Sequence, residues 1–209
     1  MSSRLTAPAA ETAETAARRP GGPVAATLAD NAAEAGRPDG ALAGPYRPVL
    51  ATLAYAVDQE RGKVLLIFKD SDRGDTELTK YNGVGGKLEP GENVVAGMRR
   101  EFTEETGLEA VRHRLRGTVS WPGFGPGGES WFGFIFRVDA WSGELLKRTR
   151  EGRLEWLDLD RLVNLDLPLW PGDRYFLPLV FDPAVAMFHG VLPYEGGQPV
   201  GWDVEVIPA

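Results

Sequence analysis

A predicted helix over residues 93–106 is the feature that most constrains how this chain can fold. It follows a Gly-rich turn and ends at Gly107, the residue type that most often stops a helix. At about 100° per residue, Val94, Met98 and Phe102 fall within an arc of roughly 80° on one side of this helix. We expect that arc to be buried against a hydrophobic core.

Three glutamates near the C-terminal end of the helix conflict with a plain hydrophobic stripe. Glu105 falls inside the apolar arc, Glu101 lies about 20° beyond its edge, and Glu104 points further out. Glu101 and Glu105 are one turn apart, so their like charges repel each other. A divalent cation would compensate them, because Mg²⁺ takes few protein oxygens and completes its shell with water and substrate phosphates. The helix alone leaves a second interpretation open, in which solvated glutamates pair with Arg99 and Arg100.

Composition excludes several classes of function. The 209 residues hold 23 Lys and Arg against 30 Asp and Glu, a formal net charge of −7, without a long basic stripe for duplex nucleic acid. Cysteine is absent, which excludes disulfides, zinc-thiolate sites and thiol nucleophiles. No apolar run approaches the roughly 20 residues that cross a bilayer, and the N-terminus lacks the apolar core of a signal peptide. We therefore expect a cytoplasmic protein with neither membrane nor duplex nucleic acid as partner; the sequence does not predict its oligomeric state.

The chain divides into a tail and one domain. Residues 1–45 are rich in Ala, Pro, Gly, Glu and Arg and hold no aromatic residue, so they cannot repay the entropy of ordering and we predict a disordered tail. Residues 46–209 are expected to form an α/β domain, an α/β/α sandwich whose mixed sheet lies between helices. We predict strands at 49–57, 64–68, 113–121, 131–141, 154–157, 186–194 and 200–207. A second helix is expected to start near Asp173.

A specific pattern spans the Gly-rich turn and the helix. It reads Gly86, five residues, Glu92, seven residues, Arg100-Glu101-Phe102, one residue, Glu104-Glu105, one residue, Gly107-Leu108. The pattern matches the Nudix box at every specified position, and a chance match somewhere in the chain has a probability on the order of 10⁻⁷. The chain therefore resembles the Nudix hydrolase family. A Walker A loop is excluded, because Leu88 follows Gly86-Lys87 where Ser or Thr is required.

The resemblance implies a Mg²⁺-dependent pyrophosphohydrolase that acts on a small-molecule nucleotide, with Mn²⁺ as an alternative ion. The metal ligands implied by position are Glu101, Glu104 and Glu105, helped by the carbonyl of Gly85. The resemblance also implies that Glu92 pairs with Arg100 and orients the acids without touching metal.

The resemblance also implies one acid outside the box, and it leaves the identity of the general base open. Family members usually recruit another acid, and Glu151 is the candidate here, with a solvated turn charge as the alternative. The implied chemistry is attack at phosphorus by a metal-activated water. Either Glu104 or Glu151 is the general base, and the sequence does not decide between them. Lys87 and Arg99 are candidate phosphate contacts, with simple solubility as their alternative.

Resemblance to the oxidised-purine triphosphatases, the MutT-type 8-oxo-dGTP diphosphatases, extends beyond the box. It rests on residues 81–87, 170–178 and 188–190. It implies that Trp170 packs against the base while Asp173 and Asn82 bond to its edge. Other interpretations stay open: Asn82 as a turn residue, Asp173 as a helix cap and Trp170 as a core anchor.

One position departs from these relatives. They carry two adjacent acids after the Trp-Pro pair, whereas this chain has Gly172 and Asp173. The change removes a hydrogen-bond partner for the base, worth roughly 0.5 to 3 kcal/mol. The competing functions are a Nudix hydrolase of nucleotide sugars or dinucleoside polyphosphates, and a nucleotide-binding module without turnover.

Overall fold

Strands and a few helices alternate along residues 45–69 and 79–209, the part of the chain that this computed structural model describes. The strands are β1 (Val49–Asp58), β2 (Lys63–Lys69), β3 (Lys80–Asn82), β4 (Leu108–Trp121), β5 (Trp131–Gly143), β6 (Arg153–Asp158), β7 (Val185–Val191), β8 (Tyr194–Glu195), β9 (Gln198–Pro199) and β10 (Asp203–Pro208). The helices are α2 (Val94–Thr106), α3 (Leu159–Val163) and α4 (Asp173–Phe181). The predicted tail over residues 1–45 lies outside the described residues except for Pro45.

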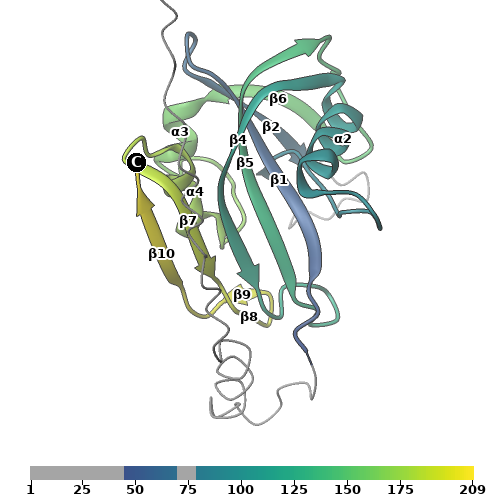
Figure 1. The fold of residues 1–209 in the computed structure, drawn as a ribbon. Coiled ribbons are helices and arrows are strands. Elements are labelled where there is room, and N and C mark those ends of the chain that lie inside the picture. Colours follow the sequence, from purple (N-terminus) through teal and green to yellow (C-terminus); the bar gives the residue numbers. More distant parts are fainter. Residues whose placement is uncertain (1–44, 70–78) are drawn as a thin grey trace, which may run out of the picture. The chain divides into compact units, whose positions relative to one another are not determined.

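A mixed sheet forms the centre of the domain (Figure 1). Its strands run in the order β10-β7-β4-β5-β1-β2-β3, and β6 pairs with β2 in addition. The pairs β1–β5 and β4–β7 are parallel, and the other neighbours in this sheet are antiparallel. The predicted mixed sheet is therefore confirmed.

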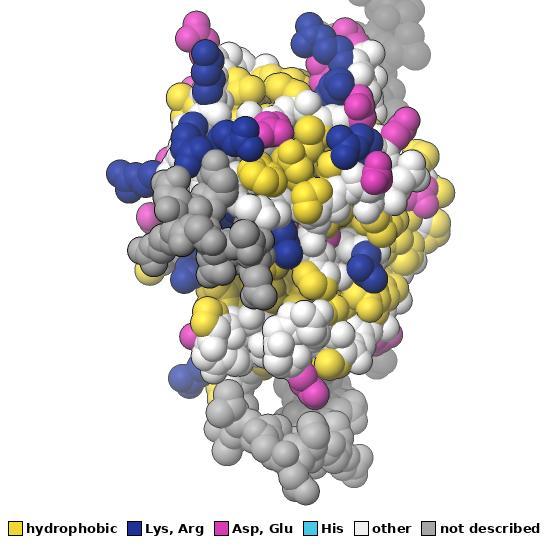
Figure 2. Space-filling view, turned by 180° about the vertical axis from the view of Figure 1, so that it is seen from behind, with side chains coloured by type: hydrophobic (Ala, Val, Ile, Leu, Met, Phe, Trp, Pro, Cys, Tyr) yellow, Lys and Arg dark blue, Asp and Glu magenta, His cyan; other side chains and the backbone are white. Residues whose placement is uncertain are grey.

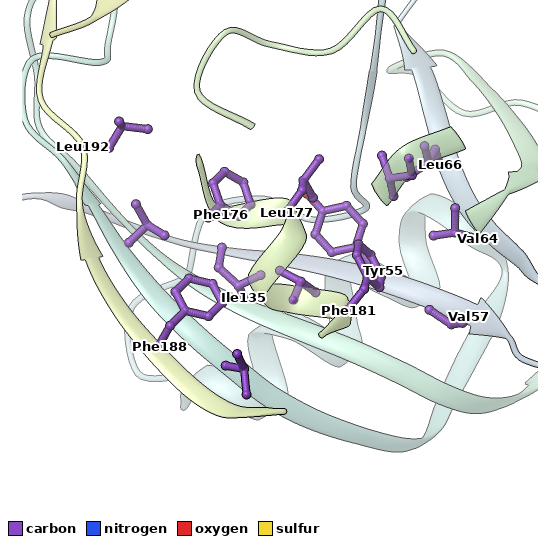
Figure 3. Packing of buried hydrophobic residues seen from close by; sticks show 14 of the residues in the cluster. Tyr55, Val57, Val64, Leu66, Ile135, Phe176, Leu177, Phe181, Phe188 and Leu192 are labelled. Atoms are coloured by element: carbon purple, nitrogen blue, oxygen red, sulfur yellow. The ribbon is translucent and has the colours of Figure 1, made fainter. Parts of the chain in front are cut away.

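Side chains alternate between the two faces of the sheet and build one core on each side. In β1, Tyr55 and Val57 belong to one core, whereas Ala54 and Ala56 belong to the other. The first core packs against α3 and α4, and Figure 3 shows the α4 side chains turned toward those of β1 and β2. The Tyr55 and Phe181 rings meet edge to face with centroids 5.6 Å apart. The second core packs against α2 (Figure 1), so helices cover both faces and the predicted sandwich is confirmed.

The sheet splits between β1 and β2, and a loop enters the gap. β2 pairs with β1 only near the β-turn that joins them, and its second half pairs with β3 instead. Residues 84–87 take the place of β2 along the first half of β1. Val84 pairs with Ala54 there, and the Thr52 N–H donates to the Gly86 carbonyl at 2.8 Å. The Gly-rich loop is thus held by the sheet itself.

Helix α2 has the boundaries that the sequence predicts. The Asn93 side chain accepts hydrogen bonds from the N–H groups of Val95 and Ala96, at 3.1 and 3.0 Å. Gly107 ends the helix with a φ of 75°, a left-handed conformation that glycine adopts without strain. The helix therefore starts and stops at fixed positions, which fixes the direction in which each of its acids points.

Several elements differ from the prediction, among them β10, which begins at Asp203 and not at the predicted 200. β4 begins at Leu108, earlier than the predicted 113, because irregular register around Arg112 breaks the alternation that identifies a strand. The predicted strand at 186–194 is wrong in extent, since β7 ends at Val191 and Tyr194 belongs to β8; Pro193, which cannot donate to a ladder, separates them. The sequence does not predict α3, because five residues are too few for a helical period.

Buried Arg116 on β4 clamps the C-terminal end of α4. Its guanidinium donates to the carbonyls of Val180 at 2.8 Å, Leu179 at 3.3 Å and Asp182 at 2.9 Å. It also donates to Ala186 on β7 at 3.2 Å. Carbonyls at a helix end lack partners within the helix and carry partial negative charge, so a cation is well matched to them.

We expect Arg116→Met to lower the free energy of unfolding by about 2 to 4 kcal/mol, because the helix end loses its charged donors. Urea denaturation followed by circular dichroism measures the change. Arg112→Met is the matched control: this exposed side chain donates to the Asp139 carbonyl at 3.2 Å. The loss in the control should stay within about 0.5 kcal/mol. Equal losses in the two variants would contradict the role of Arg116 as a clamp.

Candidate active site

Two glycines allow the loop before α2 to approach its neighbours closely. Gly85 has a φ of 154°, and a Cβ there would overlap the Thr52 carbonyl. A Cβ on Gly86 would stand 2.5 Å from the carboxylate of Glu101. A side chain at either position would push the loop away from β1 or from the acidic end of α2.

Glu105 is the buried acid that ties this loop to α2. Its carboxylate accepts a hydrogen bond from the Gly85 N–H at 2.8 Å, and the residue is only 8% exposed. Burial, with a smaller contribution from the charge of Glu151, raises the pKa of Glu105 to about 8, although the Gly85 hydrogen bond acts in the opposite direction. The negative charge of Glu105 is therefore only partly compensated by protein groups. The metal-ligand role of the Gly85 carbonyl stays a prediction.

Arg100 connects two acids to the loop. Its Nε and Nη2 donate to the two carboxylate oxygens of Glu92 at 3.1 and 2.7 Å, and Nη1 donates to Glu101 at 2.9 Å. Nη2 also donates to the Lys87 carbonyl at 3.1 Å. The hydrogen bond from Arg100 is the main cause that lowers the pKa of Glu92, and the same bond raises the pKa of Arg100. The structure thus brings Glu92 and Arg100 together in the two-point geometry typical of a rigid pair.

The remaining predicted acids occupy different environments. Glu151 lines a cavity together with Glu101, and its carboxylate pairs with Lys69 at 2.6 Å. The Glu104 side chain is 60% exposed and meets Arg100 at 3.4 Å. Glu104 does not line the cavity, which agrees with its outward position on the helical wheel.

The donor set fits a hard divalent cation. Glu101 and Glu151 line one cavity, and the buried Glu105 lies close enough for both charges to raise its pKa. Within the described ranges, no three acidic or histidine side chains enclose an ion by themselves, and Arg100 and Lys69 pair with Glu101 and Glu151. Carboxylates in this arrangement suit an ion such as Mg²⁺, which keeps several waters and takes further ligands from phosphates.

A cavity of about 520 Å³ opens beside the acids. This volume lies within the range of small-molecule sites. Besides Glu101 and Glu151, the lining includes six aromatic side chains: Trp121, Phe124, Trp131, Trp170, Phe176 and Tyr194. The cavity therefore offers both acidic oxygens and flat apolar surface to one ligand.

Three residues predicted to hold a base, Asn82, Trp170 and Asp173, all line this cavity. Asp173 is 7% exposed and accepts a hydrogen bond from the Trp170 N–H at 3.1 Å. Burial raises the pKa of Asp173 to about 7. The alternative that Asp173 caps α4 is wrong, because Gly172 occupies the N-cap and no side chain caps the helix there.

Two lysines stand over two tryptophans of the lining. The Lys87 ammonium lies 5.2 Å from the centroid of the Trp131 ring, and the Lys80 ammonium lies 5.5 Å from that of Trp170. Lys87 itself lines the cavity, as a candidate phosphate contact should. Arg99, the other candidate, is exposed and lines a different, shallow depression, so the structure does not bring it to the cavity.

Sequence reasoning missed five aromatic residues of the lining: Trp121, Phe124, Trp131, Phe176 and Tyr194. Phe124 contacts the rings of Trp121, Trp131 and Tyr194, with centroids 6.0, 5.9 and 5.1 Å away, respectively. Trp121 and Trp131 end and begin the strands on either side of a Gly-rich turn, and they pair directly across those strands. Aromatic residues at both ends of a predicted hairpin turn are the signal that could have identified this wall.

Charged side chains on the face seen in Figure 2 are mixed in sign. Lys and Arg stand on both sides of a group of hydrophobic side chains, with Asp and Glu among them. The described residues visible on this face form no continuous basic band of the kind that follows a nucleic acid backbone. Among the described residues, no helix has the length and hydrophobicity needed to span a membrane.

Comparison with known proteins gives consistent matches in sequence. The NUDIX domain matches residues 47–180, more than half of the chain. The chain is 31% identical over 147 residues to the oxidized purine nucleoside triphosphate hydrolase of Danio rerio, covering 70% of this chain and 87% of that protein. It is 35% identical over 133 residues to the protein of the same name from Mus musculus, covering 64% and 80% of the two chains.

A solved structure agrees with the sequence matches. The crystal structure of a MutT protein from Bacillus halodurans superimposes with a TM-score of 0.64 at 28% identity, covering 75% of this chain and 97% of that one. Nudix hydrolases generally use divalent metals such as Mg²⁺ and act on small-molecule nucleotide substrates. With its sandwich fold, its acid-bearing helix and these matches, the chain belongs to the Nudix hydrolase family.

Proposed function

We propose that this enzyme is a Mg²⁺-dependent pyrophosphohydrolase that cleaves an oxidised purine nucleoside triphosphate, such as 8-oxo-dGTP, to the monophosphate and pyrophosphate. The observation that carries the proposal is a single cavity lined by acids of the Nudix box and by a wall of aromatic rings. Acids suit metal-bound phosphates, and flat rings suit a purine. The relatives named as oxidized purine nucleoside triphosphate hydrolases support this choice of substrate.

The acids of the site take two different roles in the proposed enzyme: some bind the metal, and one holds Arg100. The proposed ligands of Mg²⁺ or Mn²⁺ are Glu101, Glu104, Glu105 and Glu151, with the carbonyl of Gly85. When bound, the ion supplies an activated water and neutralises charge on the phosphates. Arg100 holds the Glu101 carboxylate at 2.9 Å and is itself held by Glu92, so this pair keeps the ligand oriented.

Glu151 is better placed than Glu104 to accept the proton of the attacking water. A general base has to reach the reacting atoms, and Glu151 already lines the cavity, whereas the exposed Glu104 side chain would first have to turn from Arg100 toward the ion. This argument from geometry favours Glu151 among the two acids that the sequence leaves open.

The base and the phosphates take separate parts of the lining. Trp170 packs against the base, and Asp173 and Asn82 bond to its edge, because each of them lines the cavity and Asp173 keeps one carboxylate oxygen free of the Trp170 N–H. Lys87 leaves the Trp131 ring to contact a phosphate, since an ammonium binds an anion more strongly than it binds a ring.

Incubation of the purified enzyme with Mg²⁺ and a panel of nucleotides tests the substrate. We expect 8-oxo-dGTP to give the highest kcat/KM among 8-oxo-dGTP, dGTP, dATP, a nucleotide sugar and a dinucleoside polyphosphate. Ion-exchange chromatography should identify the monophosphate and pyrophosphate as products, and chelation of the metal should stop the reaction. A preference for the nucleotide sugar or the dinucleoside polyphosphate would refute the proposed substrate, and tight binding without turnover would indicate a non-catalytic module.

We expect Glu105→Gln to lower kcat by at least about 100-fold, because the amide cannot supply a charged oxygen to the metal. The amide oxygen still accepts from the Gly85 N–H, so the fold should persist, as thermal denaturation can verify. Glu109→Gln is the matched control, since this exposed residue lies just beyond the helix and outside the cavity. Near wild-type turnover of Glu105→Gln with Mg²⁺ would remove Glu105 from the ligand set.

The buried carboxyl group of Asp173 makes the unfolding free energy of the protein depend on pH. Its pKa rises from 3.8 to about 7 on folding, so between these values the unfolded chain releases a proton that the folded protein keeps. The contribution of Asp173 to stability therefore falls as pH rises from about 4 to about 7 and is constant above that range. We expect Asp173→Asn to exceed the wild type in unfolding free energy at pH 8, by at least about 1 kcal/mol, and to lose this advantage near pH 4. Urea denaturation at several pH values measures the unfolding free energy of both proteins. A difference between them that does not change with pH would contradict the raised pKa of Asp173.

A further inference from the structure

Gly172 is required for space and not for backbone conformation. Its φ of −77° and ψ of −20° lie in the right-handed helical region, which every L-residue adopts. A Cβ at this position, however, would overlap the hydroxyl group of Tyr194. Gly172 therefore leaves room for the Tyr194 hydroxyl, which fills the volume that a side chain at position 172 would need.

Tyr194 brings a phenol to the wall of the ligand cavity. Tyr194 comes from β8, is 9% exposed and lines the cavity beside Asp173. Among the described residues, no hydrogen bond to protein involves this hydroxyl. Burial, and next the charge of Asp173, raise the pKa of Tyr194 to about 12, so the phenol keeps its proton. The hydroxyl is therefore available to bond to a ligand in the cavity.

We propose that Tyr194 is a specificity-determining residue that donates a hydrogen bond to the oxygen at position 6 of a guanine-type base, beside Asp173 as the acceptor. This inference rests on the proposed function, because it requires a purine in the aromatic part of the cavity.

The chemistry of the base edge supports this assignment. Guanine carries an acceptor oxygen at position 6 and an amino donor at position 2, whereas adenine carries an amino donor at position 6. An ionised carboxylate only accepts hydrogen bonds, but a phenol donates. The free oxygen of Asp173 can therefore accept from base N–H groups while the Tyr194 O–H matches the carbonyl oxygen. An adenine in the same orientation would present an amino donor, which the Tyr194 hydroxyl could meet only as a weaker acceptor after turning its own proton away.

Binding of nucleoside monophosphates in the absence of metal tests the inference without the hydrolytic reaction. The probes are dGMP and 6-thio-dGMP, which differ only at the atom on position 6, and sulfur is the weaker acceptor. Trp121, Trp131 and Trp170 line the cavity, so quenching of tryptophan fluorescence should report binding. We expect the unaltered protein to bind dGMP about tenfold more tightly than 6-thio-dGMP. In Tyr194→Phe this ratio should fall close to one, whereas in Tyr175→Phe, a neighbouring tyrosine packed on Trp202 outside the lining, it should persist.

A double-mutant cycle with Gly172 adds a second test. Gly172→Ala alone should displace the Tyr194 hydroxyl and reduce the same dGMP preference. In the Tyr194→Phe background the hydroxyl is gone, so Gly172→Ala should cost little more. Additive effects of the two substitutions would overturn the assigned coupling.

The outcomes separate this inference from the function on which it rests. If the unaltered protein does not hydrolyse 8-oxo-dGTP or any other nucleoside triphosphate, the proposed function fails. If it does hydrolyse 8-oxo-dGTP, and Tyr194→Phe leaves the preference for dGMP over 6-thio-dGMP unchanged, only the assignment of Tyr194 fails.

Discussion

The hydrogen bond from the Gly85 N–H to the buried carboxylate of Glu105 is the interaction on which the rest of the site depends. It joins the loop that replaces β2 along β1 to the acidic end of α2. A carboxylate in this position ionises with difficulty, as its pKa of about 8 indicates. A fold with stability alone as its purpose would place Leu or Phe at this point of the apolar arc. The presence of a carboxyl group at this point is therefore best explained by a positively charged ligand of the site, which would favour its ionised form.

The neighbouring charges limit the cost of this buried acid. Arg100 binds Glu92 and Glu101, and Lys69 binds Glu151, so most of the negative charge around Glu105 is paired. Arg100 also bonds to the Lys87 carbonyl, which gives the loop a second attachment to α2. The same bonds that neutralise charge thus hold the loop in position. Removing one partner would leave a half-paired network, which is costlier than an apolar site of equal volume.

Local sequence pattern predicts whatever depends on neighbouring residues, and it fails where distant segments meet. The direction of Glu105 follows from the helical period, and the ends of α2 follow from Asn93 and Gly107, so both are predictable. The aromatic wall is not, because Phe124 meets Tyr194 across 70 positions of the chain. No periodicity encodes such a contact. The first part of β4 is also not predictable from the sequence. Its register is irregular, and a bulge interrupts the alternation of buried and exposed residues that identifies a strand.

The charge of the lining bears on how an acidic protein would accept the proposed triphosphate. Its charged members are Lys69, Lys87, Glu101, Glu151 and Asp173, two cations against three acids. With Asp173 ionised the lining has a net charge of −1, and it repels a polyphosphate despite its lysines. One divalent cation changes the sign to +1, so nucleotide and metal should strengthen each other's binding. The overall charge of −7 thus says little about the ligand, because the local balance at one cavity decides whether phosphates can enter.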